Sequence, residues 1–171
     1  MAEGSRWDVG DHDGFLACYD ATRQEVFRYA VRLTGDRQLA EDLVHDIYVQ
    51  TLRRARSSEL EPIGVGWLCR AVRHRHLDWL RGTERERRRL RLVASRAERG
   101  DPIDLGMSSG GDSLLAALTD RERAAIVLHH VDELAVAEVA QLLGTTVRAT
   151  ESLLARARSK ARREHEEVRD A

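Results

Sequence analysis

The feature that most constrains the fold is a glycine between two short helical patterns near the carboxyl end of the chain. Before it, apolar residues keep the spacing of one buried helix face at Val136, Val139, Ala140 and Leu143. Gly144 has the backbone freedom that a sharp turn needs, and the hydroxyl of Thr145 or Thr146 can cap the next helix. The pattern predicts a helix-turn-helix, although a helical hairpin inside a bundle fits the same pattern.

The second helix of this motif has distinct inner and outer faces. Helical spacing places Thr150, Leu154 and Ala157 on the inner face. The outer face, where a recognition helix meets the DNA major groove, holds Arg148, Glu151, Ser152 and Ala155.

Composition limits the fold and the setting. The chain has 171 residues, 42% of them hydrophobic, which is enough for one modest core or two small ones, and its two prolines favour an all-helical chain. Neither Cys18 nor Cys69 has another cysteine or a histidine at the spacing of a zinc-binding motif or a disulfide framework. We therefore expect neither a zinc site nor a disulfide framework. No run approaches the roughly 18 apolar residues of a membrane span, and the amino-terminal residues do not resemble an export signal. We expect a cytoplasmic protein.

Charge is segregated along the chain although the net charge is only −1. Residues 1–50 hold ten acidic and five basic side chains, whereas residues 67–96 hold ten arginines and three acidic residues. Residues 97–151 are acidic again, and the tail is basic. Basic faces suit nucleic acid and acidic faces suit a protein partner, although solvated helix faces explain any single arginine.

Apolar spacing predicts helices over about residues 15–34, 36–55 and 67–97, with a loop at 57–66. A glycine- and serine-rich linker follows at 100–112, then a short helix at 114–118, and Thr119 and Glu122 form a capping box for a helix over 121–130. We therefore expect an all-α protein of two small helical domains, residues 10–97 and 112–165, joined by a flexible linker at 98–111.

Three segments in this order resemble the extracytoplasmic-function (ECF) group of sigma-70-like RNA polymerase sigma factors. RLTGDRQLAEDLVHDIY (32–48) is similar to the start of sigma region 2, and WLCRAVRHRHLDWLR (67–81) to the helix that closes it. LTDRERAAIVLHHVDELAVAEVAQLLGTT with SLLARAR (118–158) is similar to region 4. The resemblance implies an alternative sigma factor, not an enzyme, that binds core RNA polymerase through its β′ clamp and β subunits, binds promoter DNA, and is regulated by an anti-sigma factor.

The resemblance also assigns roles to residues. Asp42, His45 and Asp46 share one helix face and would dock on the polymerase clamp, although a solvated acidic face is the alternative, and His45 stands where the family has glutamine. The loop 57–66 and the helix behind it match the part that captures the melted −10 strand. The residues that would contact the −10 strand are Arg70, Arg73, His74, Arg75 and Arg81. Trp67 is expected in the core rather than against a base.

Region 4 would bind the −35 element. The residues assigned to this contact are Thr146, Arg148, Glu151, Ser152, Arg156 and Arg158, with Lys160 near the DNA backbone. Two departures matter, because the family has lysine in place of Glu151 and a polar residue in place of Leu153. They leave an alternative, a sigma-like adaptor whose region 4 binds a protein more than DNA.

His74, His76 and Asp78 spell HxHxD, a spacing found in metal-dependent hydrolases. On a helix the two imidazoles lie about 200° apart, so they cannot share one metal ion. The sequence shows neither a phosphate-binding glycine loop nor a nucleophile with a partnered base. We expect no catalytic residue, metal or cofactor.

Overall fold

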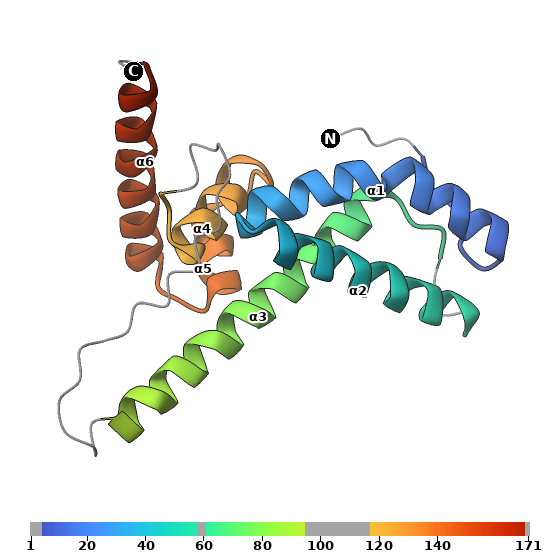
Figure 1. The fold of residues 1–171 in the computed structure, drawn as a ribbon, viewed down its shortest axis with the longest axis horizontal. Helices are drawn as coiled ribbons and strands as arrows, with labels where there is room; N and C mark the ends of the chain where they lie inside the picture. The colour runs from blue at the N-terminus through green and yellow to red at the C-terminus, as the bar shows by residue number, and fades with distance from the viewer. Residues whose placement is uncertain (1–4, 58–60, 95–116, 170–171) are drawn as a thin grey trace.

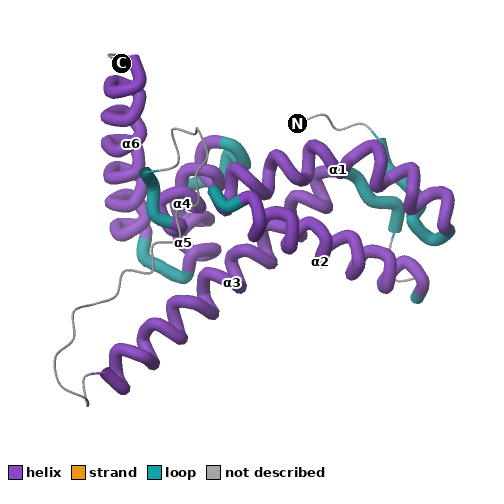
Figure 2. The backbone as a smooth tube through the Cα atoms, in the orientation of Figure 1, coloured by secondary structure: helices purple, strands orange, loops and turns teal. Residues whose placement is uncertain are grey.

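The computed structural model describes residues 5–57, 61–94 and 117–169, and these residues fold into six helices. Figures 1 and 2 show their arrangement. In chain order they are α1 (His12–Thr34), α2 (Arg37–Arg56), α3 (Val65–Ala94), α4 (Asp120–His130), α5 (Val136–Leu143) and α6 (Val147–Arg169). Within the described residues, extended pairing is limited to one bridge between Trp7 and Ile63. The expected all-α class is confirmed.

The boundary between α1 and α2 follows from two adjacent residues. Gly35 has the left-handed conformation (φ 68°), and its N–H donates to the carbonyl of Val31, which ends α1. The carboxylate of Asp36 accepts hydrogen bonds from the N–H groups of Gln38 and Leu39, which starts α2. The turn expected at these residues is therefore present.

The carboxyl-terminal helices also begin and end where the sequence indicates. Thr119 and Glu122 form the expected capping box at the start of α4. Gly144 is left-handed (φ 61°) and ends α5. Of the two threonines considered, Thr146 is the one whose Oγ1 accepts a hydrogen bond, at 3.2 Å, from the N–H of Ala149 at the start of α6. The helix-turn-helix of α5 and α6 is thus formed as predicted.

One expectation about a connecting segment needs correction, and others fall outside the described residues. The loop predicted at 57–66 ends earlier, because α3 begins at Val65 after Gly64, whose carbonyl accepts from the N–H groups of Trp67 and Leu68. The short helix predicted at 114–118 lies mostly outside the described residues, but Ala117 and Leu118 form a turn. That turn leads directly into the cap of α4. The linker at 98–111 and the exact domain boundaries also lie outside the described residues.

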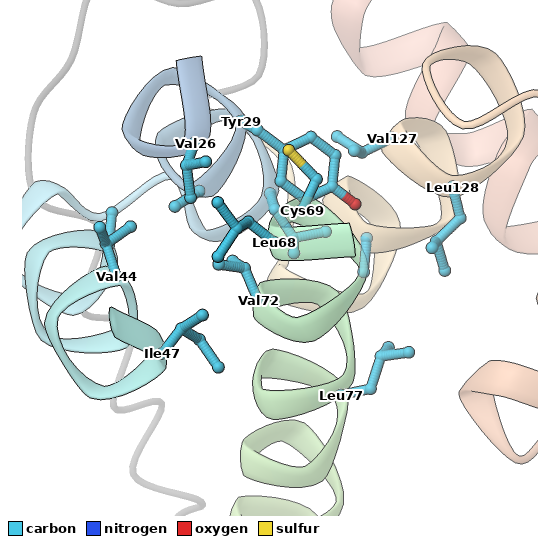
Figure 3. Packing of buried hydrophobic residues seen from close by; sticks show 14 of the residues in the cluster. Val26, Tyr29, Val44, Ile47, Leu68, Cys69, Val72, Leu77, Val127 and Leu128 are labelled. Carbon is cyan, nitrogen blue, oxygen red and sulfur yellow. The ribbon is translucent and has the colours of Figure 1, made fainter. Parts of the chain in front are cut away.

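One hydrophobic cluster joins the amino-terminal helices α1–α3 to the carboxyl-terminal helices α4–α6. Val127 and Leu128 of α4 face Tyr29 of α1 and Cys69 and Leu77 of α3 (Figure 3). All five residues are at most 5% exposed. The two halves are thus packed against each other, and we call this packing of α1–α3 on α4–α5 the closed arrangement.

Gly35 provides a test of this packing. A Cβ atom at Gly35 would collide with the guanidinium group of Arg123 from α4, and the left-handed backbone itself disfavours any side chain. We expect Gly35→Ala to lower the free energy of unfolding by about 2 kcal/mol in urea denaturation.

The matched control is Gly82→Ala within α3, where an added Cβ meets nothing within 4 Å. Alanine in an open helical position should stabilise the protein by roughly 0.5–1 kcal/mol. Equal effects at the two glycines would contradict the described packing of Arg123 on Gly35.

Candidate nucleic-acid interface

The predicted −10-binding residues all lie on α3, but the helix directs them to different sides. Arg70, His74 and Arg81 are exposed, and their spacing aligns them along one stripe of the helix surface. Leu68, Val72, His76 and Leu80 are buried on the other sides of the helix, and Leu77, which helical spacing places in line with the stripe, is buried as well. α3 therefore contributes both a core face and an exposed basic stripe.

Arg73 points away from that stripe and toward the carboxyl-terminal half. Its Nη1 lies 3.0 Å from Oδ2 of Asp132, in the loop after α4, and the hydroxyl of Tyr29 donates to the same oxygen at 2.9 Å. The side chains of Arg73 and Asp132 are only 15% and 7% exposed. This carboxylate therefore ties α1 and α3 to the loop that precedes the helix-turn-helix.

Arg81 also contacts the other half of the protein. Its Nη2 donates to the carbonyl of Leu142 in α5 at 2.7 Å, and its Nη1 pairs with Asp78 of its own helix. The guanidinium group remains 43% exposed. The same residue is thus placed both at the contact between the halves and at the end of the exposed stripe.

Asp42 and His45 of the predicted polymerase-binding set are exposed on α2, and Asp46 is partly exposed. Asp42 accepts a hydrogen bond from Gln38 at 3.3 Å, whereas Asp46 pairs across to Arg75 of α3 at 3.0 Å. Both members of that pair are about half exposed, so solvent screens it strongly. The predicted common face exists, and one of its carboxylates is shared with the −10-binding set.

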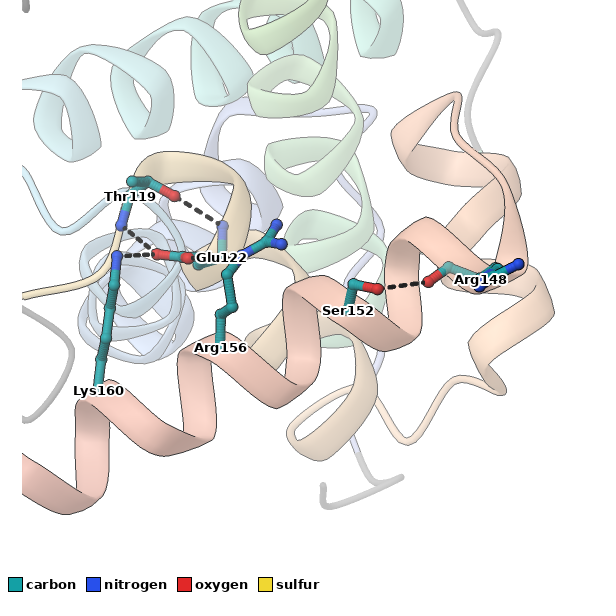
Figure 4. A network of polar contacts seen from close by, with 6 residues as sticks. All are labelled: Thr119, Glu122, Arg148, Ser152, Arg156 and Lys160. Carbon is teal, nitrogen blue, oxygen red and sulfur yellow. Dashed lines mark hydrogen bonds and ion pairs between the residues drawn. The ribbon is translucent and has the colours of Figure 1, made fainter.

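The six residues assigned to the −35 contact are all exposed at the start and along the outer side of α6. Thr150, Leu154 and Ala157 are buried as the spacing predicted. Ser152 donates to the carbonyl of Arg148 at 2.9 Å, so these two residues lie one turn apart on the same surface (Figure 4). The exposed and buried faces of α6 are therefore those that helical spacing predicts.

Glu122, whose role beyond capping was not foreseen, anchors the middle of α6. Its side chain is 5% exposed and contacts Lys160 at 2.7 Å and Arg156 at 3.5 Å (Figure 4). Burial alone would raise the pKa of the Glu122 carboxyl, but hydrogen bonds from Lys160 and Thr119 outweigh it and lower the pKa. The capping pattern gave a signal for Glu122, whereas nothing local indicated its partners 34 and 38 residues away.

The two departures from the family pattern on α6 have different environments. Leu153 is partly buried and packs against the hydrophobic cluster, so its apolar side chain has a structural role. Glu151 is exposed on the outer face next to Ser152. Only Glu151 changes the chemistry of the surface that would face DNA.

The HxHxD segment places its two histidines in different environments. His74 is exposed, whereas His76 is fully buried and stacks on Trp79. Among the residues that the structure describes, no group of three or more histidine, cysteine, aspartate or glutamate side chains is placed to hold a metal ion.

The described part of the chain contains no helix long and apolar enough to cross a membrane. Trp67 is partly buried and packs against the core, as expected.

Two family models match the chain. The model of sigma-70 region 2 matches residues 18–86, and the model of sigma-70 region 4 matches residues 112–160. The first contains the helix pair and the basic stripe of α3, and the second contains α4, α5 and most of α6. Together the two matches cover more than half of the chain.

The chain is similar to two ECF RNA polymerase sigma factors, and each match covers most of both proteins. SigW of Bacillus subtilis is 23% identical in an alignment 169 residues long, and the match covers 91% of this chain and 90% of SigW. SigK of Mycobacterium tuberculosis is 26% identical in an alignment 159 residues long, and the match covers 84% of this chain and 82% of SigK. The sigma factor RpoE of Bartonella quintana, solved in complex with the anti-sigma factor NepR, has a similar fold. Its TM-score is 0.51 at 19% identity, and the match covers 91% of this chain and 98% of RpoE.

His76 makes stability depend on pH. Burial, and to a lesser extent the charge of Arg123, lower the pKa of His76 to about 4, while both ring nitrogens lack a hydrogen-bond partner among the described residues. An unfolded chain protonates this histidine near pH 6.5, so it binds more protons than the folded protein between pH 6.5 and 4. The contribution of neutral His76 to stability is therefore complete above about pH 6.5 and is lost as the pH falls toward 4.

The expected loss is roughly 3 kcal/mol over this range. His76→Leu removes the titrating ring at similar volume and should flatten that part of the curve of unfolding free energy against pH. Parallel curves for the two proteins would show that His76 is not buried as described.

Proposed function

Because this chain belongs to the ECF group of sigma-70-like sigma factors, we propose that it directs core RNA polymerase to promoters with defined −10 and −35 elements. Members of this family are initiation factors without catalytic activity, so the chemistry of RNA synthesis belongs to the polymerase. The observation that carries the proposal is the pair of exposed basic surfaces on α3 and α6, each within the sigma region that its family model matches.

The first proposed surface is the face of α2 that docks on the polymerase clamp. Asp42 and His45 are exposed one turn apart, and Asp46 adds a second carboxylate beside them. A carboxylate-bearing face suits a basic partner and would speed association at low salt. The pairing of Asp46 with Arg75 links this face to α3, which the proposal places at the −10 strand.

The second surface is the exposed stripe of Arg70, His74 and Arg81 on α3. A melted strand offers phosphates and unstacked bases, and arginine and imidazole groups can contact both. Trp79 is 39% exposed on the same helix and supplies an aromatic ring nearby. Preferential binding of this surface to single-stranded DNA would shift the promoter toward the open state.

The third surface is the outer face of α6 at the −35 element. We assign Arg148 and Ser152 to base edges and Arg156 and Arg158 to phosphates, and all four side chains are exposed. Glu151 favours a second candidate function, because a carboxylate in the groove repels phosphates. In that case region 4 would bind a protein, such as an anti-sigma factor, rather than DNA.

Core binding should depend on the charge of the α2 face. We expect Asp42→Arg to weaken binding to core polymerase at least tenfold at low salt, measured by fluorescence anisotropy of labelled protein. Asp20→Arg on the exposed surface of α1 is the control, since it makes the same charge change elsewhere. Equal effects of the two variants would remove the α2 face from the proposal.

Promoter binding by the holoenzyme should separate the roles on α6. Arg148→Ala is expected to cost about 1–3 kcal/mol and to relax sequence preference at one −35 position. Arg158→Ala should weaken binding to all sequences alike and lower the salt slope by about one. Glu151→Lys should raise affinity for any duplex if this face meets DNA. If Glu151→Lys leaves DNA binding unchanged, the protein-binding alternative is favoured.

A further inference from the structure

The closed arrangement brings the two proposed DNA-binding surfaces close together. The guanidinium group of Arg81 on α3 bonds to the carbonyl of Leu142 in α5 at 2.7 Å, and α5 lies beside α3 in Figure 1. Thr146, at the start of the −35 surface, follows four residues later. Four residues span at most about 14 Å, so Thr146 lies within roughly 20 Å of the Arg81 guanidinium group.

A promoter requires a much larger separation. Elements centred near −10 and −35 are about 25 base pairs apart, which is roughly 85 Å along a straight duplex at 3.4 Å per base pair. The closed arrangement therefore cannot bind both elements at once. The two halves must separate before a promoter is bound through both surfaces.

The contact that holds the halves together also occupies a proposed DNA ligand. Arg73 is assigned to the −10 strand, but here it pairs with Asp132 at 3.0 Å and is only 15% exposed. Its Nε is buried and has no hydrogen-bond partner among the described residues, so the group retains donor capacity once it is released. The Asp132 carboxylate thus takes the position that a phosphate oxygen would take on Arg73.

Tyr29 adds specificity to this contact. Its hydroxyl donates to the same Asp132 oxygen at 2.9 Å, and its ring belongs to the cluster shared by the two halves. Asp132 is therefore held by two donors from the amino-terminal half, one from α1 and one from α3. Glu133, the next residue, is exposed, so the two adjacent carboxylates have opposite environments.

We infer that Asp132 is an intramolecular latch: it docks the loop after α4 on Tyr29 and Arg73, keeps the free protein closed, and masks Arg73 from single-stranded DNA. This inference rests on the proposed function for the identity of the masked ligand. Promoter binding then competes with latch closure, because Arg73 cannot pair with Asp132 and a phosphate in the same geometry. A closed fraction reduces the apparent affinity for DNA in proportion to the open population that remains.

The test uses the full chain without polymerase, so it does not depend on initiation. Asp132→Asn keeps the side-chain size and removes the charge, and Glu133→Gln makes the same charge change on the neighbouring exposed residue. Small-angle X-ray scattering measures the radius of gyration, and anisotropy measures binding to a fluorescent single-stranded DNA oligonucleotide. Thermal unfolding verifies that each variant folds, and Tyr29→Phe, which removes only one donor, serves as a second and milder variant.

We expect Asp132→Asn to enlarge the radius of gyration and to tighten oligonucleotide binding about tenfold. Tyr29→Phe should change both quantities less. Glu133→Gln should have no effect beyond that of removing one negative charge. An unchanged radius for Asp132→Asn would overturn the latch. A larger radius without tighter binding would overturn the masking of Arg73. Failure of the proposed sigma function would give a different result. In that case Asp132→Asn would still enlarge the radius of gyration, but the protein would not bind core polymerase.

Discussion

The carboxylate of Asp132 is the buried polar contact that joins the two halves of the protein. It accepts hydrogen bonds from Tyr29 of α1 and Arg73 of α3, and it lies two residues after the end of α4. Removal of one partner from a buried ion pair leaves an unpaired charge, which is more costly than the pair itself is stabilising. Such a pair consequently favours one specific docking geometry over the many that apolar contacts between Val127, Leu128 and α3 would permit.

The helix α3 serves the fold and the proposed function at once. Its inner face, including Leu68 and Val72, belongs to the core, and its outer stripe carries the exposed residues assigned to the −10 strand. Arg73 lies at the border between these faces, where it pairs with Asp132. Separation of the two halves would expose Arg73 to solvent. A helix that is apolar on one side and basic on the other can thus couple the separation of the halves to DNA binding.

Local signals in the sequence were sufficient for the helices, their caps and the faces of α6. Gly35, Asp36, Thr119 and Gly144 each act within a few residues of their position, so spacing and residue type reveal them. The contacts between the halves were not predictable in this way. Tyr29 and Asp132 are 103 residues apart. A single aspartate in a loop is usually exposed, and its sequence neighbours do not indicate which distant residues it contacts. For the same reason, Arg73 and Arg75 appeared equivalent on α3, although one pairs with Asp132 and the other with Asp46.

Run-off transcription shows whether this chain directs transcription initiation. Core polymerase from a GC-rich bacterium would be supplied with a fragmented genomic library as template, with and without the protein. We expect new discrete start sites that share −10 and −35 motifs and appear only when the protein is present. Stable binding to core polymerase without any new start would contradict this expectation and would instead identify an adaptor.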